Sequence, residues 1–135
     1  MSSALSSAIR EFLDGPGHFA VVATVNADST PHQAVVWYAR QGETVLVNAS
    51  DGRRWAANAR RMGYMSLTVA DAYDYVILTG PLDVVEDLEL AEADIRSLAH
   101  RYGDDEEQFR GQRRVSFVLH PGHVATHGRL ASGAE

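Results

Sequence analysis

The residues best suited to chemistry lie where an apolar strand runs into a helix, between positions 45 and 62. The run V-L-V at positions 45 to 47 is typical of a buried strand, and Asn48, Ala49 and Ser50 interrupt it. Ser50 is predicted to cap the helix, because its hydroxyl can accept a hydrogen bond from an early helical N–H. The remaining first-turn N–H groups, with the positive end of the helix dipole behind them, favour a phosphate. The segment therefore predicts an anion site.

Two arginines strengthen this interpretation. Arg53 and Arg54 follow within the first turn, and guanidinium groups bind phosphate through paired, planar hydrogen bonds. The alternative is that they form, with Arg60 and Arg61, only a solvated helix face, the usual role of a charge run. Their position at a helix start in an acidic chain favours the anion site, whereas Asp51 would compete with a phosphate unless an arginine neutralises it. Three residues at helical spacing are predicted to face the core: Trp55, Ala59 and Met62.

The composition is that of one acidic domain. The chain has 135 residues, and we expect a single domain at 1–128 followed by a flexible tail at 129–135. The net charge is -6 and all 12 basic residues are arginine, which argues against nucleic acid or a membrane as partner. The absence of cysteine excludes disulfides and thiolate metal sites. No segment approaches the ~18 apolar residues of a membrane helix, so we predict a cytoplasmic protein.

The elements that must position the anion site follow from hydrophobic periodicity and turn residues. Helices are predicted at 3–13, as a short lid, and at 51–62 and 87–102. Strands are predicted at 18–26, 32–40, 44–49, 64–70, 75–85, 114–120 and 124–127, with a polar connection at 103–112. The first three strands are joined by tight turns and predict an antiparallel meander. Gly80 and Pro81 predict a bulge or bend. The pattern indicates an α+β domain, about six mainly antiparallel strands forming a closed or nearly closed barrel with peripheral helices.

The order of these motifs resembles a known family. The segments F-A-V-V-A-T-V-N-A-D-S-T-P-H-Q-A-V-V-W-Y, V-L-V-N-A-S-D-G-R-R-W-A-A-N-A-R-R, S-L-T-V and Y-V-I-L-T-G-P-L-D-V-V-E-D resemble the pyridoxamine 5'-phosphate oxidase-like proteins, over roughly residues 5 to 127. Those proteins are flavin-binding split β-barrels. Within the family the chain looks most like the actinobacterial flavin/deazaflavin oxidoreductases of the B group, which use coenzyme F-420. The resemblance implies a homodimer with the cofactor site between subunits.

The resemblance also implies roles for particular residues. The strand at 31 to 38 would run beside the tricyclic ring, with Val36 and Trp37 as candidate contacts and His32 as a polar contact. The residues that match the ribityl and phosphate contacts are Asn48, Ala49 and Ser50, and those that match the phosphate-holding basic residues are Arg53 and Arg54.

The same resemblance assigns a structural role to the rest of the helix. Asn58 and Arg60 match residues that stabilise the helix and do not contact cofactor. The chain departs from the family pattern at Trp55, where relatives commonly have lysine. Either the two arginines supply the missing charge, or the cofactor is bound differently or not at all; Trp55 itself suits a core or interface aromatic better than a ring stacked on cofactor.

The chemistry that this implies belongs to the cofactor, since a deazaflavin passes a hydride and the protein mainly positions it. A proton would come from water or from a hydroxyl such as that of Tyr38 or Tyr75. His120, His123 and His127 form a cluster whose spacing matches no standard metal or haem site, and no metal is predicted.

Three hypotheses about function stay open at this point. The first is an F-420-dependent oxidoreductase that reduces a small unsaturated substrate. The second is an FMN-dependent oxidoreductase of the same fold, and the third is a non-enzymatic protein that binds a flavin, a deazaflavin or haem. The sequence does not identify the substrate.

Overall fold

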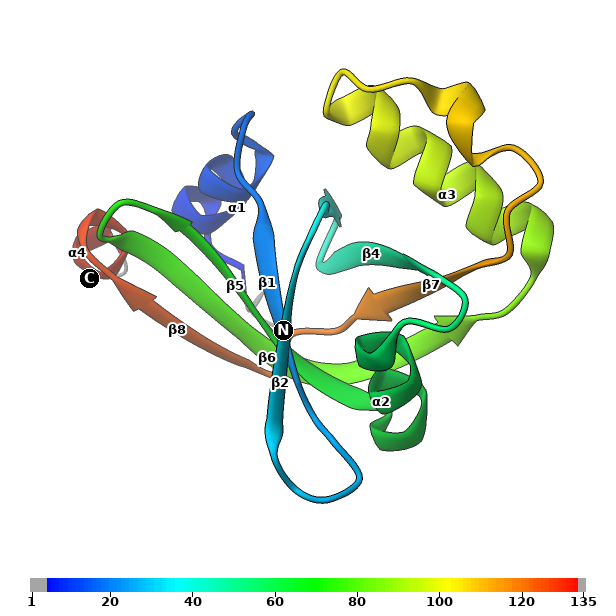
Figure 1. Cartoon of the computed structure of the whole chain (residues 1–135). Coiled ribbons are helices and arrows are strands. Elements are labelled where there is room, and N and C mark those ends of the chain that lie inside the picture. The colour runs from blue at the N-terminus through cyan, green and yellow to red at the C-terminus, as the bar shows by residue number, and fades with distance from the viewer. Residues whose placement is uncertain (1–4, 134–135) are drawn as a thin grey trace.

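The computed structural model describes residues 5–133 and arranges them as a curled antiparallel sheet with helices around it (Figure 1). The strands are β1 (Ala20–Val25), β2 (Pro31–Val36), β3 (Ala39–Gln41), β4 (Thr44–Ser50), β5 (Tyr64–Asp71), β6 (Asp74–Val85), β7 (Arg114–Leu119) and β8 (His123–His127). The helices are α1 (Ser7–Asp14), α2 (Arg54–Met62), α3 (Leu88–Arg101), α4 (Arg129–Gly133) and the 3-10 helix η1 (Glu106–Phe109). The predicted α+β class is confirmed, with a sheet of 8 strands in place of about six.

The two edges of the sheet are neighbours along the chain. The strand order is β2-β1-β5-β6-β7-β4-β3, with β8 paired to β6. The edge strands β2 and β3 are separated only by Trp37 and Tyr38. The barrel is therefore joined on this side by covalent chain and not by a hydrogen-bonded ladder, which leaves it split.

The predicted meander of the first three strands is wrong. The segment at 32–40 is two strands, because β2 pairs with β1 whereas β3 pairs with β4. The strand after them, β4, takes β7 as its second partner. The apolar pattern continues through Trp37 and Tyr38, so it gives no local sign that the chain passes from one sheet edge to the other.

The predicted cap of α2 is also wrong. Ser50 is the last residue of β4, where it pairs with Arg114. A two-residue turn follows, and Arg53 occupies the cap position without a side-chain cap bond. The turn is tied to the end of β7, since the Asp51 N–H donates to the Arg113 carbonyl over 2.8 Å. The helix starts at Arg54. The end of β4 and the start of α2 are therefore connected by a short turn, as the predicted site requires.

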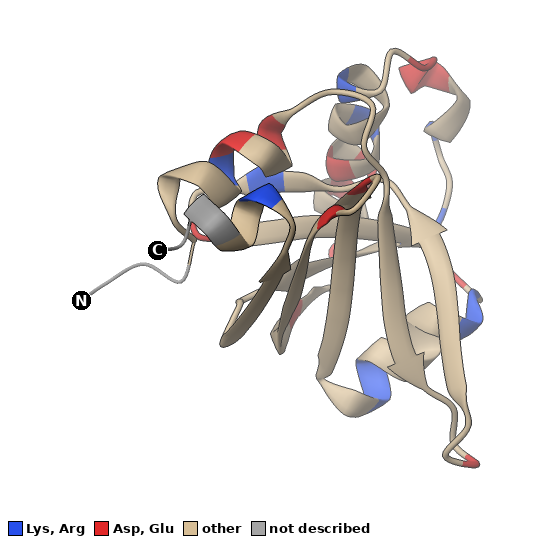
Figure 2. Ribbon diagram, turned by 90° about the vertical axis from the view of Figure 1, so that its left-hand side faces the viewer, with Lys and Arg blue, Asp and Glu red and all other residues tan. Residues whose placement is uncertain are grey.

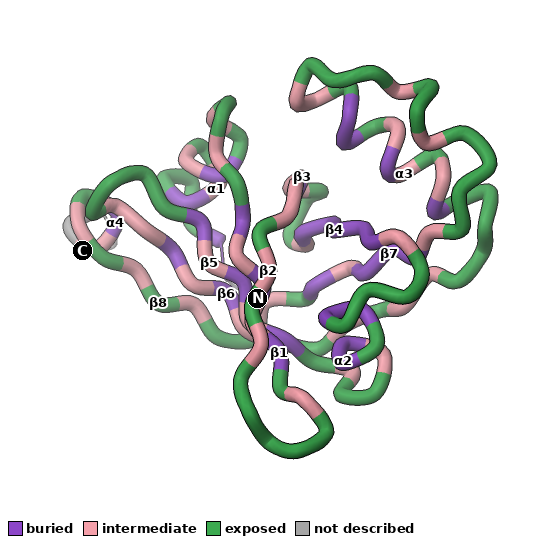
Figure 3. The backbone as a smooth tube through the Cα atoms, in the orientation of Figure 1, coloured by how far each residue is buried: buried purple, intermediate pink, exposed green. Residues whose placement is uncertain are grey.

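The barrel interior holds the main core, and α3 covers a smaller one outside. Figure 3 shows buried residues along β4 and β7 and an exposed turn between β1 and β2. Side chains such as Val47, Leu67 and Phe117 are fully buried in the main core. A second cluster joins Ile95 and Leu98 of α3 to Leu46 of β4. The helix α3 thus lies on the outer face of the β4 and β7 strands.

The two ends of the described chain are packed close together. The predicted lid helix begins at Ser7 and is capped by Ser6, whose hydroxyl accepts from the Ile9 N–H; positions 3 and 4 lie outside the described residues. The predicted flexible tail contains the helix α4, and Leu130 is buried in the main core. In the part of the chain that the structure describes, no helix is both long and apolar enough to cross a membrane.

The predicted break at Gly80 and Pro81 is a change of strand partner. The strand β6 pairs with β8 as far as Thr79 and with β7 from Leu82 onward. At the crossing, a Cβ on Gly80 would collide with the backbone of His120, including its carbonyl oxygen. The glycine is required because the backbone of the link between β7 and β8 approaches it closely.

We expect Gly80→Ala to lower the free energy of unfolding by about 3 kcal/mol or more, because a backbone clash cannot be relieved by turning a side chain. Thermal unfolding measures the effect, with a fall in Tm of about 10 °C or more. The matched control is Gly122→Ala at the same crossing, where the added Cβ would meet only the Thr79 carbonyl oxygen at 3.8 Å. Equal Tm values for the two variants would contradict this account.

Candidate functional site

A pocket of about 370 Å³ opens beside the split in the barrel. It lies between the ends of β2 and β4, the start of α2, and the segment formed by α3, η1 and the beginning of β7. Six of the eight residues predicted from the sequence line it: Val36, Trp37, Asn48, Ala49, Ser50 and Arg53. The other two, His32 and Arg54, do not line it. Their predicted roles as cofactor contacts stay predictions.

One wall of the pocket is aromatic. Phe19, Trp37 and Phe109 line it, although they come from distant parts of the chain. Tyr102 stacks on Trp37 with ring centroids 5.2 Å apart and planes 9° apart, and on Phe19 at 5.4 Å and 17°. Phe109 meets Trp37 edge to face at 6.0 Å. Such a wall suits a flat, conjugated ring system.

Two arginines also line the pocket, and one of them, Arg114, lies over the Phe109 ring at 5.2 Å from its centroid. The other is Arg53, and no Asp or Glu is among the described residues that line the pocket. The pKa of the Arg114 guanidinium lies below its usual value, first because the group is half-buried and then because Arg53 is near. Figure 2 shows that most charges lie on helices and turns, whereas the strands are mostly uncharged. Two like charges that lack a neutralising carboxylate favour an anionic ligand, which would relieve their repulsion.

Asn48 holds the second arginine in place. Its side-chain oxygen accepts from Arg114 Nε over 2.9 Å. Its side-chain nitrogen donates to the Ala91 carbonyl and to Ser116 Oγ, each over 2.9 Å. A buried Asn with its donors and acceptor engaged in this way anchors β4 to α3 and β7, and contributes to the pocket by orienting a guanidinium.

The rest of α2 is stabilised as the resemblance implied. Asn58 is buried and donates to Thr24 Oγ1 and Asn26 Oδ1, which ties the helix to β1 and its turn. Arg60 pairs with Glu86 at 2.9 Å and with Asp51 at 3.3 Å, so the acid that would compete with a phosphate has a partner. The predicted core stripe holds for Trp55 and Ala59 but is wrong for Met62, which is 37% exposed.

Six lining residues were not among the predicted cofactor contacts: Phe19, Val35, Trp55, Ile95, Phe109 and Arg114. Phe109 is the single aromatic side chain in the polar stretch at 103–112, and an apolar residue isolated in this way is a usable signal. Arg114 begins β7, where the register places it opposite Ser50. Only the pairing of β4 with β7 brings it to the anion site.

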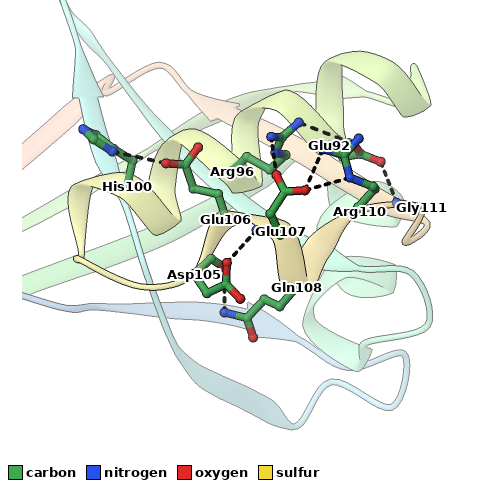
Figure 4. A network of polar contacts seen from close by, with 9 residues as sticks. All are labelled: Glu92, Arg96, His100, Asp105, Glu106, Glu107, Gln108, Arg110 and Gly111. Carbon is green, nitrogen blue, oxygen red and sulfur yellow. Dashed lines mark hydrogen bonds and ion pairs between the residues drawn. The ribbon is translucent and has the colours of Figure 1, made fainter.

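Surface ion pairs hold Phe109 at the pocket. Figure 4 shows Glu107 of η1 between Arg96 of α3 and Arg110, with contacts of 2.8 Å and 2.7 Å. His100 approaches Glu106 at 3.2 Å. The 3-10 helix is thus fastened to α3 by exposed charges, which hold it less firmly at high salt than an apolar contact would.

The predicted proton donors lie away from the pocket. Tyr38 is fully buried, and its hydroxyl donates to the Leu13 carbonyl over 2.6 Å. Burial raises the pKa of Tyr38 to about 12, so the hydroxyl stays a structural donor at physiological pH. Tyr75 stacks on His127 at 5.0 Å and does not line the pocket. The suggested role of Tyr38 is therefore wrong, because its hydroxyl points into the core.

The histidine cluster is divided by the fold. His120 lies 2.6 Å from Asp83, and His127 Nδ1 lies 2.8 Å from the Tyr73 carbonyl oxygen. Within residues 5–133 no group of three or more His, Cys, Asp or Glu side chains is arranged to hold a metal ion.

A curled antiparallel sheet that is split at one side defines a split β-barrel, and its pocket is lined by aromatic rings and two arginines with no carboxylate among the described lining residues. The family model described as Pyridoxamine 5'-phosphate oxidase matches residues 5–128. The chain belongs to this family, whose members bind flavin-type cofactors. No curated protein matches the chain significantly.

Solved structures agree on the fold. An F420 reductase has 23% identity and a TM-score of 0.75, over 93% of this chain and 98% of that one. A conserved hypothetical protein from Mycobacterium tuberculosis has 21% identity and a TM-score of 0.79, over 97% and 89%. The heme storage protein HutZ from Vibrio cholerae has 22% identity and a TM-score of 0.73, over 92% and 95%. At these identities the similarity shows the shared fold alone.

Both tryptophans of the chain, Trp37 and Trp55, line the pocket, so ligand binding can be followed by intrinsic tryptophan fluorescence. We expect a flat chromophore that enters the pocket to quench both indoles, and Trp37→Phe and Trp55→Phe each to leave a single quenched residue. Fluorescence titration of the three proteins measures this. A saturable ligand that quenches neither single-tryptophan variant would show that it binds elsewhere.

Proposed function

We propose that this pocket binds coenzyme F-420 and that the protein is an F-420-dependent oxidoreductase. The reaction transfers a hydride from the reduced cofactor to a small unsaturated organic substrate. Membership of the family supports a flavin-type oxidoreductase, and the similarity to an F420 reductase supports the choice of cofactor.

The observation that carries the proposal is the proximity of Arg53 and Arg114 in a pocket that is also lined by aromatic rings. Charge-assisted bonds from two guanidinium groups suit a phosphate, and the wall formed around Trp37 suits a tricyclic ring. A ligand with both features would contact both the arginines and the aromatic rings of the pocket. In this proposal Arg53 and Arg114 would supply the charge of the lysine that relatives commonly carry where this chain has Trp55.

The residues of the chain bind and orient, and the bound cofactor supplies the hydride. Phe19, Val36 and Phe109 contribute apolar surface, which excludes water from a conjugated ring and from an apolar substrate beside it. No described residue that lines the pocket is a Tyr, His, Asp or Glu, and Ser50 carries the hydroxyl among them, so the proton would come from Ser50 or from water at the pocket mouth.

FMN carries a phosphate and a similar ring and is the alternative cofactor for the same residues. Haem fits less well, because none of the described residues that line the pocket is a His, Cys, Met or Tyr that could serve as an axial ligand. We therefore consider haem a less suitable ligand for this pocket than F-420 or FMN, although one similar structure is a heme storage protein.

The functional unit that we propose is a homodimer. The pocket is at the small end of the usual range for ligand sites, about 300–1,000 Å³. Phe19 is 51% exposed and Val35 is 68% exposed at its border, an apolar margin that a second copy would cover. The site would then be completed by the partner subunit.

We expect Arg53→Ala to raise the Kd for F-420 about tenfold to a hundredfold, because a hydrogen bond to a charged group contributes about 1.5–3 kcal/mol. Since Arg53 is exposed, Tm without ligand should be unchanged. The change in Kd is measured by fluorescence titration and the hydride transfer by loss of cofactor absorbance with candidate acceptors.

Arg54→Ala is the matched control, since Arg54 is the adjacent arginine, equally exposed and outside the pocket lining. We expect its Kd to change less than about threefold; a larger change would support the role that the resemblance assigns to Arg54. If the unmodified protein binds FMN tightly but does not bind F-420, FMN replaces F-420 as the proposed cofactor. Unaltered F-420 affinity in Arg53→Ala would overturn the assignment of the phosphate.

A further inference from the structure

The two residues that join the edges of the sheet need hydrogen-bond partners that no strand supplies. Trp37 and Tyr38 lie between β2 and β3 and belong to neither ladder. Tyr38 is fully buried, and a buried backbone N–H or C=O without a partner is costly. For Tyr38 the partners are two side chains at the end of α3, those of Arg101 and of the following Tyr102.

Arg101 and Tyr102 bind the backbone of Tyr38 from both sides. Arg101 Nε donates to the Tyr38 carbonyl over 2.9 Å, and the Tyr38 N–H donates to the Tyr102 hydroxyl oxygen over 3.3 Å. The Tyr102 hydroxyl in turn donates a hydrogen bond to the His18 carbonyl oxygen over 2.6 Å. Arg101 also donates to the Leu13 carbonyl over 3.0 Å, the group that accepts from the Tyr38 hydroxyl.

The same two residues support the aromatic wall of the pocket. The Tyr102 ring stacks on both Phe19 and Trp37, which line the pocket while Tyr102 itself does not. The Arg101 guanidinium lies over the rings of Tyr38 and Tyr102, at 5.1 Å and 5.5 Å from their centroids. Burial raises the pKa of the Tyr102 phenol, which keeps its hydroxyl protonated as a donor.

We propose that Arg101 and Tyr102 are positioning residues that hold Trp37 against the pocket and thereby set its affinity for the ring of the cofactor. The inference rests on the proposed function for the identity of the ligand. Its structural part, the orientation of Trp37, does not depend on any ligand. The two residues act through Trp37 and Phe19 and do not touch the ligand.

The first test follows Trp37 alone, in a Trp55→Phe background. Tyr102→Leu removes the stacking ring and the hydroxyl, so we expect the emission of Trp37 to move to longer wavelength and its quenching by acrylamide to rise. Tyr75→Leu is the control, since Tyr75 stacks on His127 far from Trp37 in the chain and outside the pocket lining. Unchanged Trp37 emission in Tyr102→Leu would overturn the proposal, whether or not the protein binds F-420.

The second test separates positioning from stability. We expect Tyr102→Leu to raise the Kd and KM for F-420 about tenfold, with less than a twofold change in kcat, and Tyr102→Phe, which keeps the ring, to raise Kd about threefold. Val115→Ala is the control for stability, because Val115 is fully buried in the main core and does not line the pocket. It should lower Tm and leave Kd unchanged.

The outcomes distinguish the two proposals. If the unmodified protein binds neither F-420 nor FMN, the proposed function fails, while the emission of Trp37 still decides whether Arg101 and Tyr102 position it. If the protein binds F-420 and Tyr102→Leu binds it as tightly as Val115→Ala does, the positioning role fails and the proposed function stands. Arg101→Lys should resemble Tyr102→Phe, because lysine keeps the charge but cannot bind the Tyr38 and Leu13 carbonyls together.

Discussion

The constraint on which the structure depends is the joining of two sheet edges by two residues. Because β2 and β3 are consecutive in the chain but lie at opposite ends of the strand order, the barrel cannot complete its ladder there. The unpaired backbone of Tyr38 is satisfied by side chains from the end of α3. The fold thus requires a helix on the outer face of β4 and β7, and this helix also forms one side of the pocket.

The pocket lies at the split for the same reason. A complete ladder would fill this side of the barrel with paired strands. Instead, the chain ends β2 here, and the Trp37 side chain packs against the rings of Tyr102 and Phe109. The aromatic wall combines Trp37 from the link between β2 and β3, Phe109 from η1 and Phe19 from the segment before β1. The packing that stabilises the split is therefore also the surface offered to a flat ligand.

The arginines of this acidic protein fall into two groups, those that form ion pairs within the fold and those that line the pocket. Arginines such as Arg40, Arg60 and Arg96 have carboxylate partners and fasten helices to neighbouring elements. Arg53 and Arg114 line the pocket, and neither takes part in an ion pair among the described residues. Since the net charge is -6, a locally positive pocket is informative: it favours an anion that the rest of the surface would repel.

The sequence by itself determined the types of most elements and the basic turn after β4, because hydrophobic periodicity, turn residues and charge are local properties. It predicted Arg53, Trp37 and the strand end at Ser50, which all line one pocket. Only the tertiary structure decided that Arg114 stands opposite Ser50, that Phe109 joins Trp37, and that the strand at 32–40 divides. Those features depend on which strands pair and how the sheet curls, and contacts between residues far apart in sequence leave no periodic pattern within a segment.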